Sequence, residues 1–150
     1  CIFFLSYNTC EDMMTFLFEN PFDGELHPIQ NTPDDIFSHK LLGDGFVVNP
    51  QNKTIVAPIE GVIETIHPSK HLLMIKGKNV HVLLHLGLKA RHDIVKWHVE
   101  VGNRVAIGDP IGTLLNNFFN QSFNDQSCNI VFVEKETCTR HNAHVTCEER

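Results

Sequence analysis

The sequence lacks the features of a membrane-spanning protein and of a nucleic-acid-binding protein. None of its apolar runs approaches the roughly 20 residues that a helix needs to cross a bilayer. No cluster of lysines and arginines is present, and 12 such residues stand against 18 aspartates and glutamates, which gives a formal net charge of −6. An acidic chain without a basic patch is a poor match for nucleic acid and for anionic membrane surfaces. We therefore expect neither kind of partner.

Cysteine is scarce and confined to the two ends of the chain. Five cysteines are present, none lies between Cys10 and Cys128, and no two have the Cys-x-x-Cys spacing. An odd number without that spacing argues against a disulfide scaffold and against a zinc ribbon. We therefore expect reduced thiols and a cytoplasmic protein. A lipidated Cys1 is disfavoured because no polar spacer follows it.

Long apolar runs are also missing, and glycine and proline separate short ones. At 150 residues the chain is expected to form one domain. The short runs have the length of strands and are bounded by turn residues: 46–48, 54–56, 61–63, 72–75 and 80–86. Only one segment has residues typical of both ends of a helix, with Thr32 as N-cap, Pro33 as the first helical residue and Gly43 at the end. The pattern predicts mostly β structure with one short helix.

A weak internal repeat favours a β-sandwich. Residues 21–26 and 58–63 share the order proline, apolar, acid, glycine, any residue, apolar. We interpret each copy as an acidic turn whose glycine adopts a positive φ and leads into a strand. A third turn-rich unit spans residues 101–112, where Gly102 and Gly108 flank a short strand. Two related turn–strand units predict a sandwich built from similar halves.

Three of the ten histidines, His71, His81 and His85, stand out because they lie around an apolar hairpin. Residues 71–75 and 80–86 are joined by a turn rich in glycine and asparagine. With an odd loop, His71 faces His85 and their Cβ atoms are about 5 Å apart. With an even loop, His71 faces Leu84 and the two rings point to opposite faces of the sheet. A functional pair therefore requires an odd loop. The seven histidines outside this hairpin, His67 among them, are interpreted as surface residues.

The chemistry open to such a pair does not need a metal. His81 is on the same face as His85 but about 13 Å away along the strand, and no third ligand is placed by spacing to complete a zinc site. We expect neither metal nor another cofactor. A neutral imidazole can accept a phosphoryl group, and a second imidazole can stabilise its charge by donating a hydrogen bond. Since no glycine-rich nucleotide loop is present, the phosphate would come from another protein.

Six segments in order along the chain resemble a known family. They lie between about residue 20 and residue 115 and are 21–26, 33–37, 42–50, 56–61, 68–71 and 82–88. The chain resembles the glucose-type IIA component (EIIA type 1 domain) of the bacterial phosphoenolpyruvate-dependent sugar phosphotransferase system. The resemblance implies an all-β fold, an antiparallel β-sandwich or barrel with one or two short helices. It places the domain at residues 19–150, with residues 1–18 as an N-terminal extension.

The resemblance also implies a cytoplasmic phosphotransferase-system protein and assigns roles to its residues. His85 would accept phosphate from the carrier protein HPr and pass it to a cysteine of a IIB domain during sugar uptake. His71 would support it, and Ser69 stands where the family usually has a threonine bonded to that histidine. The matching partner-binding residues are Asp34, suited to an arginine of the partner, and the apolar Ile36, Phe37, Leu41, Leu73 and Leu83. Core packing explains the five apolar residues equally well.

The chain departs from the family after His85. Lys89-Ala90 stands where the family usually has Asp-Thr, and the loop at residues 91–100 is shorter. The alternative is a relative with impaired phosphotransfer that acts as a regulatory or binding module for transport or metabolic proteins. A biotinyl- or lipoyl-type carrier, with Lys76 or Lys78 at a hairpin tip, ranks below both because the flanking residues do not fit.

Overall fold

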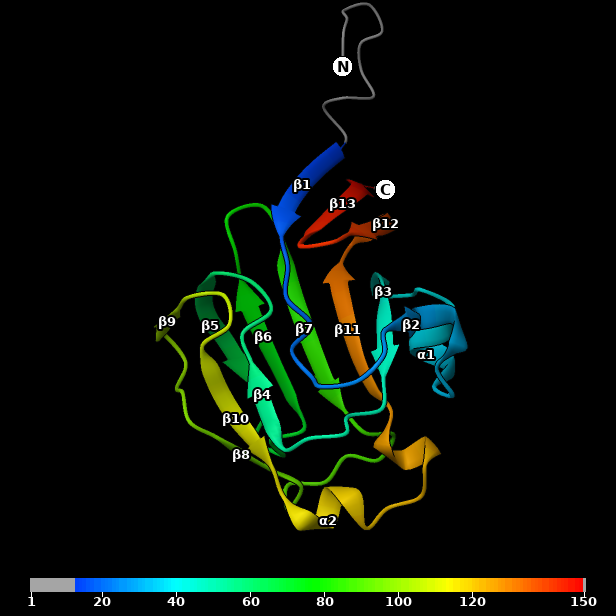
Figure 1. Cartoon of the computed structure of the whole chain (residues 1–150), viewed down its shortest axis with the longest axis vertical. Coiled ribbons are helices and arrows are strands. Elements are labelled where there is room, and N and C mark those ends of the chain that lie inside the picture. The colour runs from blue at the N-terminus through cyan, green and yellow to red at the C-terminus, as the bar shows by residue number, and fades with distance from the viewer. Residues whose placement is uncertain (1–12, 150) are drawn as a thin grey trace, which may run out of the picture.

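The computed structural model describes residues 13–149 (Figure 1). Strands make up most of the regular structure. The strands are β1 (Met13–Leu17), β2 (His27–Pro28), β3 (Gly43–Val48), β4 (Thr54–Val56), β5 (Gly61–Ile66), β6 (Leu72–Lys76), β7 (His81–Leu86), β8 (Val95–Trp97), β9 (Arg104–Val105), β10 (Pro110–Leu114), β11 (Cys128–Val133), β12 (Lys135–His141) and β13 (His144–Glu149). The helices are α1 (Asp35–Ser38), α2 (Asn116–Phe119) and the 3₁₀ turns η2 (Ile29–Asn31) and η3 (Asn124–Gln126). The strand-length apolar runs of the sequence thus correspond to β3 to β7.

Three antiparallel sheets enclose the core. The largest has the strand order β2-β3-β11-β7-β6-β5-β9, and the two smaller sheets are β4-β10-β8 and β1-β13-β12. In Figure 1 the β4-β10-β8 sheet lies across the β5-β6-β7 half of the large sheet. Inward-facing residues of both sheets, such as Leu84 and Ile111, are fully buried in one cluster. The predicted all-β, antiparallel sandwich with two short α-helices is confirmed.

The predicted helix exists but begins later than the sequence indicated. Asp34, not Thr32, is the N-cap of α1, and its carboxylate accepts a hydrogen bond from the Ile36 backbone N–H at 3.0 Å. The helix ends at Ser38 and not near Gly43, and Lys40, with a φ of 58°, lies in the turn that closes it. The backbone N–H groups of Lys40 and Leu41 then donate to the carbonyls of Phe37 and Ile36, the closing pattern of a Schellman motif.

Of the two repeated glycines, Gly24 has the positive φ that we expected, at 159°, whereas Gly61 does not, and both positions lack space for a side chain. Gly61 does not have a positive φ; a Cβ there would lie 2.3 Å from the carbonyl oxygen of Lys76 on the neighbouring strand. At Gly24 a Cβ would lie 2.8 Å from the carbonyl oxygen of Asn49. Gly102 and Gly108 do have positive φ values, 96° and 86°, and flank β9 as predicted.

The expected boundary after residue 18 is not an edge of the fold. β1 pairs antiparallel with β13 from Met13 to Leu17, and Phe18 is buried in the main core. Strand β1 therefore belongs to the same domain as the rest of the chain, because it pairs with β13 and its apolar side chains pack against the core. Residues 1–12 of the expected extension, with Cys1 and Cys10, lie outside the described residues.

The expectation that all cysteines are reduced thiols is wrong for one pair. Cys138 and Cys147 are opposite each other in the β12–β13 hairpin and form a disulfide. The tight turn at Asn142, whose φ is 55°, sets this register, and no Cys-x-x-Cys spacing is needed. Cys128 is a buried free thiol whose pKa is raised to about 12 by burial.

Reduction of this disulfide is expected to destabilise the fold. The bridge joins residues 9 apart in sequence, and closing a loop of that size corresponds to about 2–3 kcal/mol in the chain-entropy model. Chemical denaturation with and without reductant should show a loss of about 2 kcal/mol in the free energy of unfolding. The stability of the variant carrying Cys138→Ala and Cys147→Ala should not change with reductant. An equal loss of stability in that variant would show that reductant does not act through this disulfide.

Candidate functional site

The β6–β7 hairpin does not have the odd loop on which the histidine pair was expected to depend. Leu72 is opposite His85 and Lys76 is opposite His81, so residues 77–80 form an even, four-residue loop. Nevertheless the rings of His71 and His85 are 4.9 Å apart and perpendicular. His71 precedes β6, so the alternation of the strand does not govern its direction. The pairing prediction is correct in outcome and wrong in its reason.

A tight turn ahead of β6 aims His71 at His85. Lys70 has a φ of 71°, and its N–H donates to the carbonyl of His67 at 2.7 Å. The carbonyl of His71 in turn accepts from the Leu86 N–H at 2.7 Å, which attaches the turn to the end of β7. His71 is thereby fixed in place and is 7% exposed.

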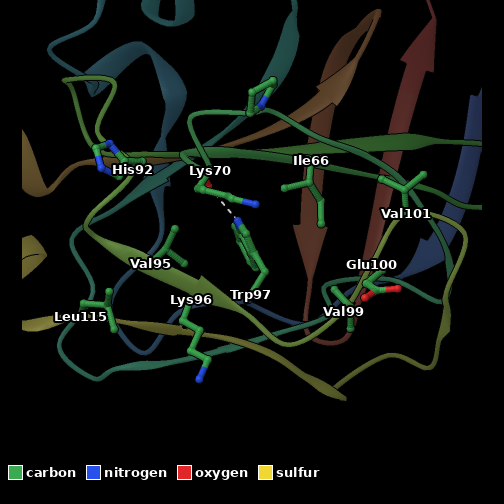
Figure 2. Close-up of a pocket in the computed structure, with 11 residues that line it drawn as sticks. Ile66, Lys70, His92, Val95, Lys96, Trp97, Val99, Glu100, Val101 and Leu115 are labelled. Carbon is green, nitrogen blue, oxygen red and sulfur yellow. Dashed lines mark hydrogen bonds between the residues drawn. The ribbon is translucent and has the colours of Figure 1, made fainter.

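Trp97 of β8 holds the same turn from the other side. Its indole Nε1 donates to the carbonyl of Lys70 at 2.7 Å, the dashed bond in Figure 2. A groove of about 840 Å³ lies beside the turn, and Trp97, Lys70, Ile66 and Val99 are among the residues that line it. Neither His71 nor His85 lines this groove. Trp97 therefore acts on the histidine pair through its hydrogen bond to the turn.

A third histidine, which the sequence analysis placed on the surface, joins the pair. Nδ1 of His67 is 2.7 Å from the hydroxyl of Ser69, and that hydroxyl makes a second, short hydrogen bond to Nδ1 of His71. The rings of His67 and His71 are 5.2 Å apart. The only trace of this arrangement in the sequence is the alternation His-x-Ser-x-His, which is too short to be noticed among ten histidines.

His85 is held as a neutral imidazole. Its pKa is lowered to about 4, first by burial and then by the nearby His71, while Asp34 and the Gly87 backbone oppose the shift. The pKa of His71 is also lowered, by burial and by His67. Nδ1 of His85 is buried. Because Nδ1 is enclosed, Nε2 is the nitrogen left to react with an incoming group.

The lowered pKa of His85 predicts a loss of stability on acidification. As pH falls below 6.5 the unfolded chain binds a proton at His85, whereas the folded chain resists it until about pH 4. Between these pH values the shift corresponds to about 3 kcal/mol of unfolding free energy. Denaturation of wild type and of His85→Ala at pH 7 and pH 4 should show a smaller acid loss in the variant. Equal losses would contradict a neutral His85 in the folded chain.

The five apolar residues predicted to bind a partner fall into three groups. Ile36 and Leu41 are exposed, at 54% and 62%. Phe37 and Leu83 are buried in a second apolar cluster on the outer face of the large sheet, where the Phe37 ring lies 4.8 Å from that of His85. Leu73 is fully buried in the main core, so it cannot contact a partner; the register that sets Leu72 opposite His85 turns Leu73 inward.

Charged groups lie at the edge of the site. Asp34 caps α1 and is close enough to His85 to raise its pKa. Lys89, where an acid was expected from the family pattern, lies 3.4 Å from the carboxylate of Asp125. Among residues 13–149 no group of three or more histidine, cysteine or acidic side chains could hold a metal ion. The same segment contains no helix long and apolar enough to cross a membrane.

Comparison with known proteins identifies the family. The family model for the phosphoenolpyruvate-dependent sugar phosphotransferase system, EIIA 1, matches residues 17–138. Glucose-specific EIIA components from two strains of Staphylococcus epidermidis are each 37% identical over 95 residues, which is 61% of this chain and 57% of theirs. The solved structure of glucose permease IIA from Mycoplasma capricolum superposes with a TM-score of 0.70 at 28% identity, covering 80% of this chain and 79% of that one. The chain therefore belongs to the EIIA 1 family of the sugar phosphotransferase system.

Proposed function

We propose that the chain is a phosphohistidine carrier that accepts a phosphoryl group from HPr on His85 and passes it to a cysteine of a IIB domain during sugar uptake. One observation carries the proposal: a neutral, half-buried His85 faces His71 at 4.9 Å. The curated relatives named as glucose-specific EIIA components support the same role. Because the chain aligns with 57% of their length, the sugar and the partners belong to this proposal.

The transfer step uses the imidazole rings of His85 and His71. Nε2 of neutral His85 attacks the phosphorus of phosphorylated HPr, so that a new N–P bond forms as the bond to HPr breaks. The charge on the phosphoryl oxygens is stabilised by an N–H of His71, which is held at its place by the turn and by Leu86. In the second half-reaction a thiolate of the IIB domain attacks the same phosphorus and His85 is released neutral.

The surface beside His85 suits a partner with apolar and basic groups. Ile36 and Leu41 are exposed apolar residues on and after α1, the helix that carries Phe37 to the His85 ring. Asp34 adds a carboxylate at the start of the same helix and can pair with an arginine of the partner. Contacts of this kind orient the two histidines of a transfer complex, which is most of what such catalysis requires.

Lys89 is the feature that favours the alternative of a phosphotransfer-impaired binding module. Its ammonium group repels a basic partner, although the pair with Asp125 offsets part of its charge. The histidine pair itself is intact, so we rank the carrier first. If the wild type is not phosphorylated, Lys89→Asp is the variant to test for rescue.

The direct test is phosphorylation of the purified chain. Incubation with phosphoenolpyruvate, enzyme I and HPr should add one acid-labile phosphoryl group, measured by intact mass. Omitting HPr should abolish the addition. A folded chain that gains no mass would contradict the carrier and leave the binding module.

Trp97 gives a prediction for the turn that positions His71. Trp97→Phe removes the N–H that donates to the Lys70 carbonyl, and the loss of one hydrogen bond costs about 1 kcal/mol. Because a misplacement of about 1 Å can slow a reaction about 100-fold, transfer from HPr should slow by about 10-fold or more while the fold persists. Lys96→Ala on the same strand is the matched control, and equal rates in both variants would refute a positioning role for Trp97.

A further inference from the structure

The disulfide joins an edge strand to the core of the sandwich. Within residues 13–149, strand β12 lies at the edge of its sheet and pairs with β13 alone. Cys147 of β13 is fully buried in the main core, whereas Cys138 of β12 is only partly buried and most other residues of β12 are exposed. A reagent in solution can therefore reach the sulfur of Cys138 more readily than that of Cys147.

Strand β12 also holds the segment 40–44, which follows α1. The backbone N–H of Cys138 donates to Oδ2 of Asp44 at 2.7 Å. Nζ of Lys40 donates to the carbonyl of Glu136 at 3.4 Å and lies 3.5 Å from Oδ1 of Asp44. Because Asp44 is 6% exposed, its carboxylate depends on these protein donors rather than on water. The position of segment 40–44 is thus tied to the position of β12.

The same segment closes the helix beside His85. The N–H of Lys40 donates to the carbonyl of Phe37 at 3.0 Å, and that of Leu41 donates to the carbonyl of Ile36 at 3.3 Å. The ring of Phe37 lies 4.8 Å from that of His85, and the side chains of Ile36 and Leu41 are exposed. The contacts of β12 therefore support the surface on which a partner of His85 would dock.

We propose that the bond between Cys138 and Cys147 is a site of thiol–disulfide exchange, and that its reduction loosens the α1 surface beside His85. The co-reactant is a dithiol. One of its thiolates attacks Sγ of Cys138, the S–S bond breaks, and Cys147 leaves as a thiolate that takes up a proton. The second thiolate of the co-reactant then displaces Cys138 from the mixed disulfide, and Cys138 takes up a proton in turn. The co-reactant becomes a disulfide, two electrons and two protons pass to the chain, and the reverse exchange restores the bond.

Reduction acts first on β12. Without the bond to Cys147, an edge strand with one neighbour opens locally more often than a strand inside a sheet. Each opening withdraws the N–H of Cys138 from Asp44 and the carbonyl of Glu136 from Lys40, so the turn that closes α1 loses support. Cys147 stays in the core as a buried thiol, an environment in which free cysteine is common. The sandwich therefore persists while α1 becomes mobile.

The effect on phosphotransfer rests on the proposed function. A docking surface that is correctly arranged for a smaller fraction of the time binds its partner more weakly by the same fraction. Transfer from phosphorylated HPr to His85 is therefore expected to be about 5-fold slower in the reduced chain, the factor that corresponds to the loss of one hydrogen bond.

Amide hydrogen exchange of the full-length chain, followed by NMR, tests the proposal without phosphotransfer. Reduction with dithiothreitol should speed exchange by about 5-fold or more at residues 36–44 and at Cys138. The amides of α2 are the matched control, because α2 is also four residues long and lies at the opposite end of the sandwich from the β12–β13 hairpin (Figure 1). Their exchange should not change. The variant carrying Cys138→Ala and Cys147→Ala should exchange rapidly at α1 both with and without dithiothreitol.

The outcomes separate this proposal from the proposed function. Three results would overturn it whether or not the chain carries phosphate: equal exchange at residues 36–44 in the oxidised and reduced wild type, equal increases at α1 and α2, or a disulfide that dithiothreitol does not reduce in the folded chain. Should the double variant fail to fold, the comparison of oxidised and reduced wild type still decides.

Phosphotransfer supplies the second measurement. Without reductant, the double variant should accept phosphate from HPr about 5-fold more slowly than the oxidised wild type. Equal rates would refute the effect on docking. No transfer to either folded chain would contradict the proposed function, and the exchange measurement would still decide for or against the redox site.

Discussion

His85→Ala is expected to take up no phosphoryl group from phosphorylated HPr. The variant removes the neutral Nε2 that would form the N–P bond, and among residues 13–149 no other histidine ring lies against both Phe37 and His71. Intact mass after incubation with phosphoenolpyruvate, enzyme I and HPr measures the loss.

The matched control is His81→Ala. His81 lies on the same strand and the same face as His85. It is paired with Glu64 at 2.8 Å and does not take part in the hydrogen bonds that link His67, Ser69 and His71. It should accept phosphate at the wild-type level. Full phosphorylation of a folded His85→Ala chain would show that the acceptor is another residue.

His71→Ala is expected to have the second largest effect, on transfer rather than on the acceptor itself. The variant keeps the nucleophile but loses the N–H that stabilises charge on the phosphoryl oxygens. Removing one such donor usually slows a reaction by about 100- to 1,000-fold. The phosphorylated form should still accumulate slowly, and its transfer to a IIB domain should be slower by about that factor, measured by rapid mixing.

His71→Gln distinguishes this role from simple packing. Glutamine fills much of the same space and carries an amide donor, so it should recover part of the transfer rate that alanine loses. If alanine and glutamine are equally slow, the ring of His71 matters for its shape or its charge and not as a donor. If neither is slow, His71 has no part in transfer.

The sequence predicted the strands because each is a short apolar run bounded by turn residues. The runs at 46–48 and 72–75 lie inside β3 and β6, and the helix signals placed α1 close to its true position. The resemblance of ordered segments located His85, His71 and Ser69, which the structure brings to one site. Local patterns and ordered motifs were sufficient to locate these strands and these three site residues.

The contacts that depend on three-dimensional geometry could not be predicted. The even hairpin loop would have separated His71 from His85, but the turn with Lys70 at positive φ brings them together. The disulfide follows from the register of β12 and β13, which spacing alone does not set. For Leu73 the sequence left partner binding and core packing equally open, and only the register that turns it inward decides for the core. His67 entered the site through a hydrogen-bond chain that leaves no motif.

The central claim is that Nε2 of His85 carries the phosphoryl group. The most direct measurement is nitrogen-15 and phosphorus-31 NMR of the chain phosphorylated by enzyme I and HPr, which identifies the nitrogen bonded to phosphorus. We expect a single phosphorus coupled to Nε2 of His85, with Nδ1 protonated. Phosphorus on His71, on another residue or on no residue of a folded chain would contradict it.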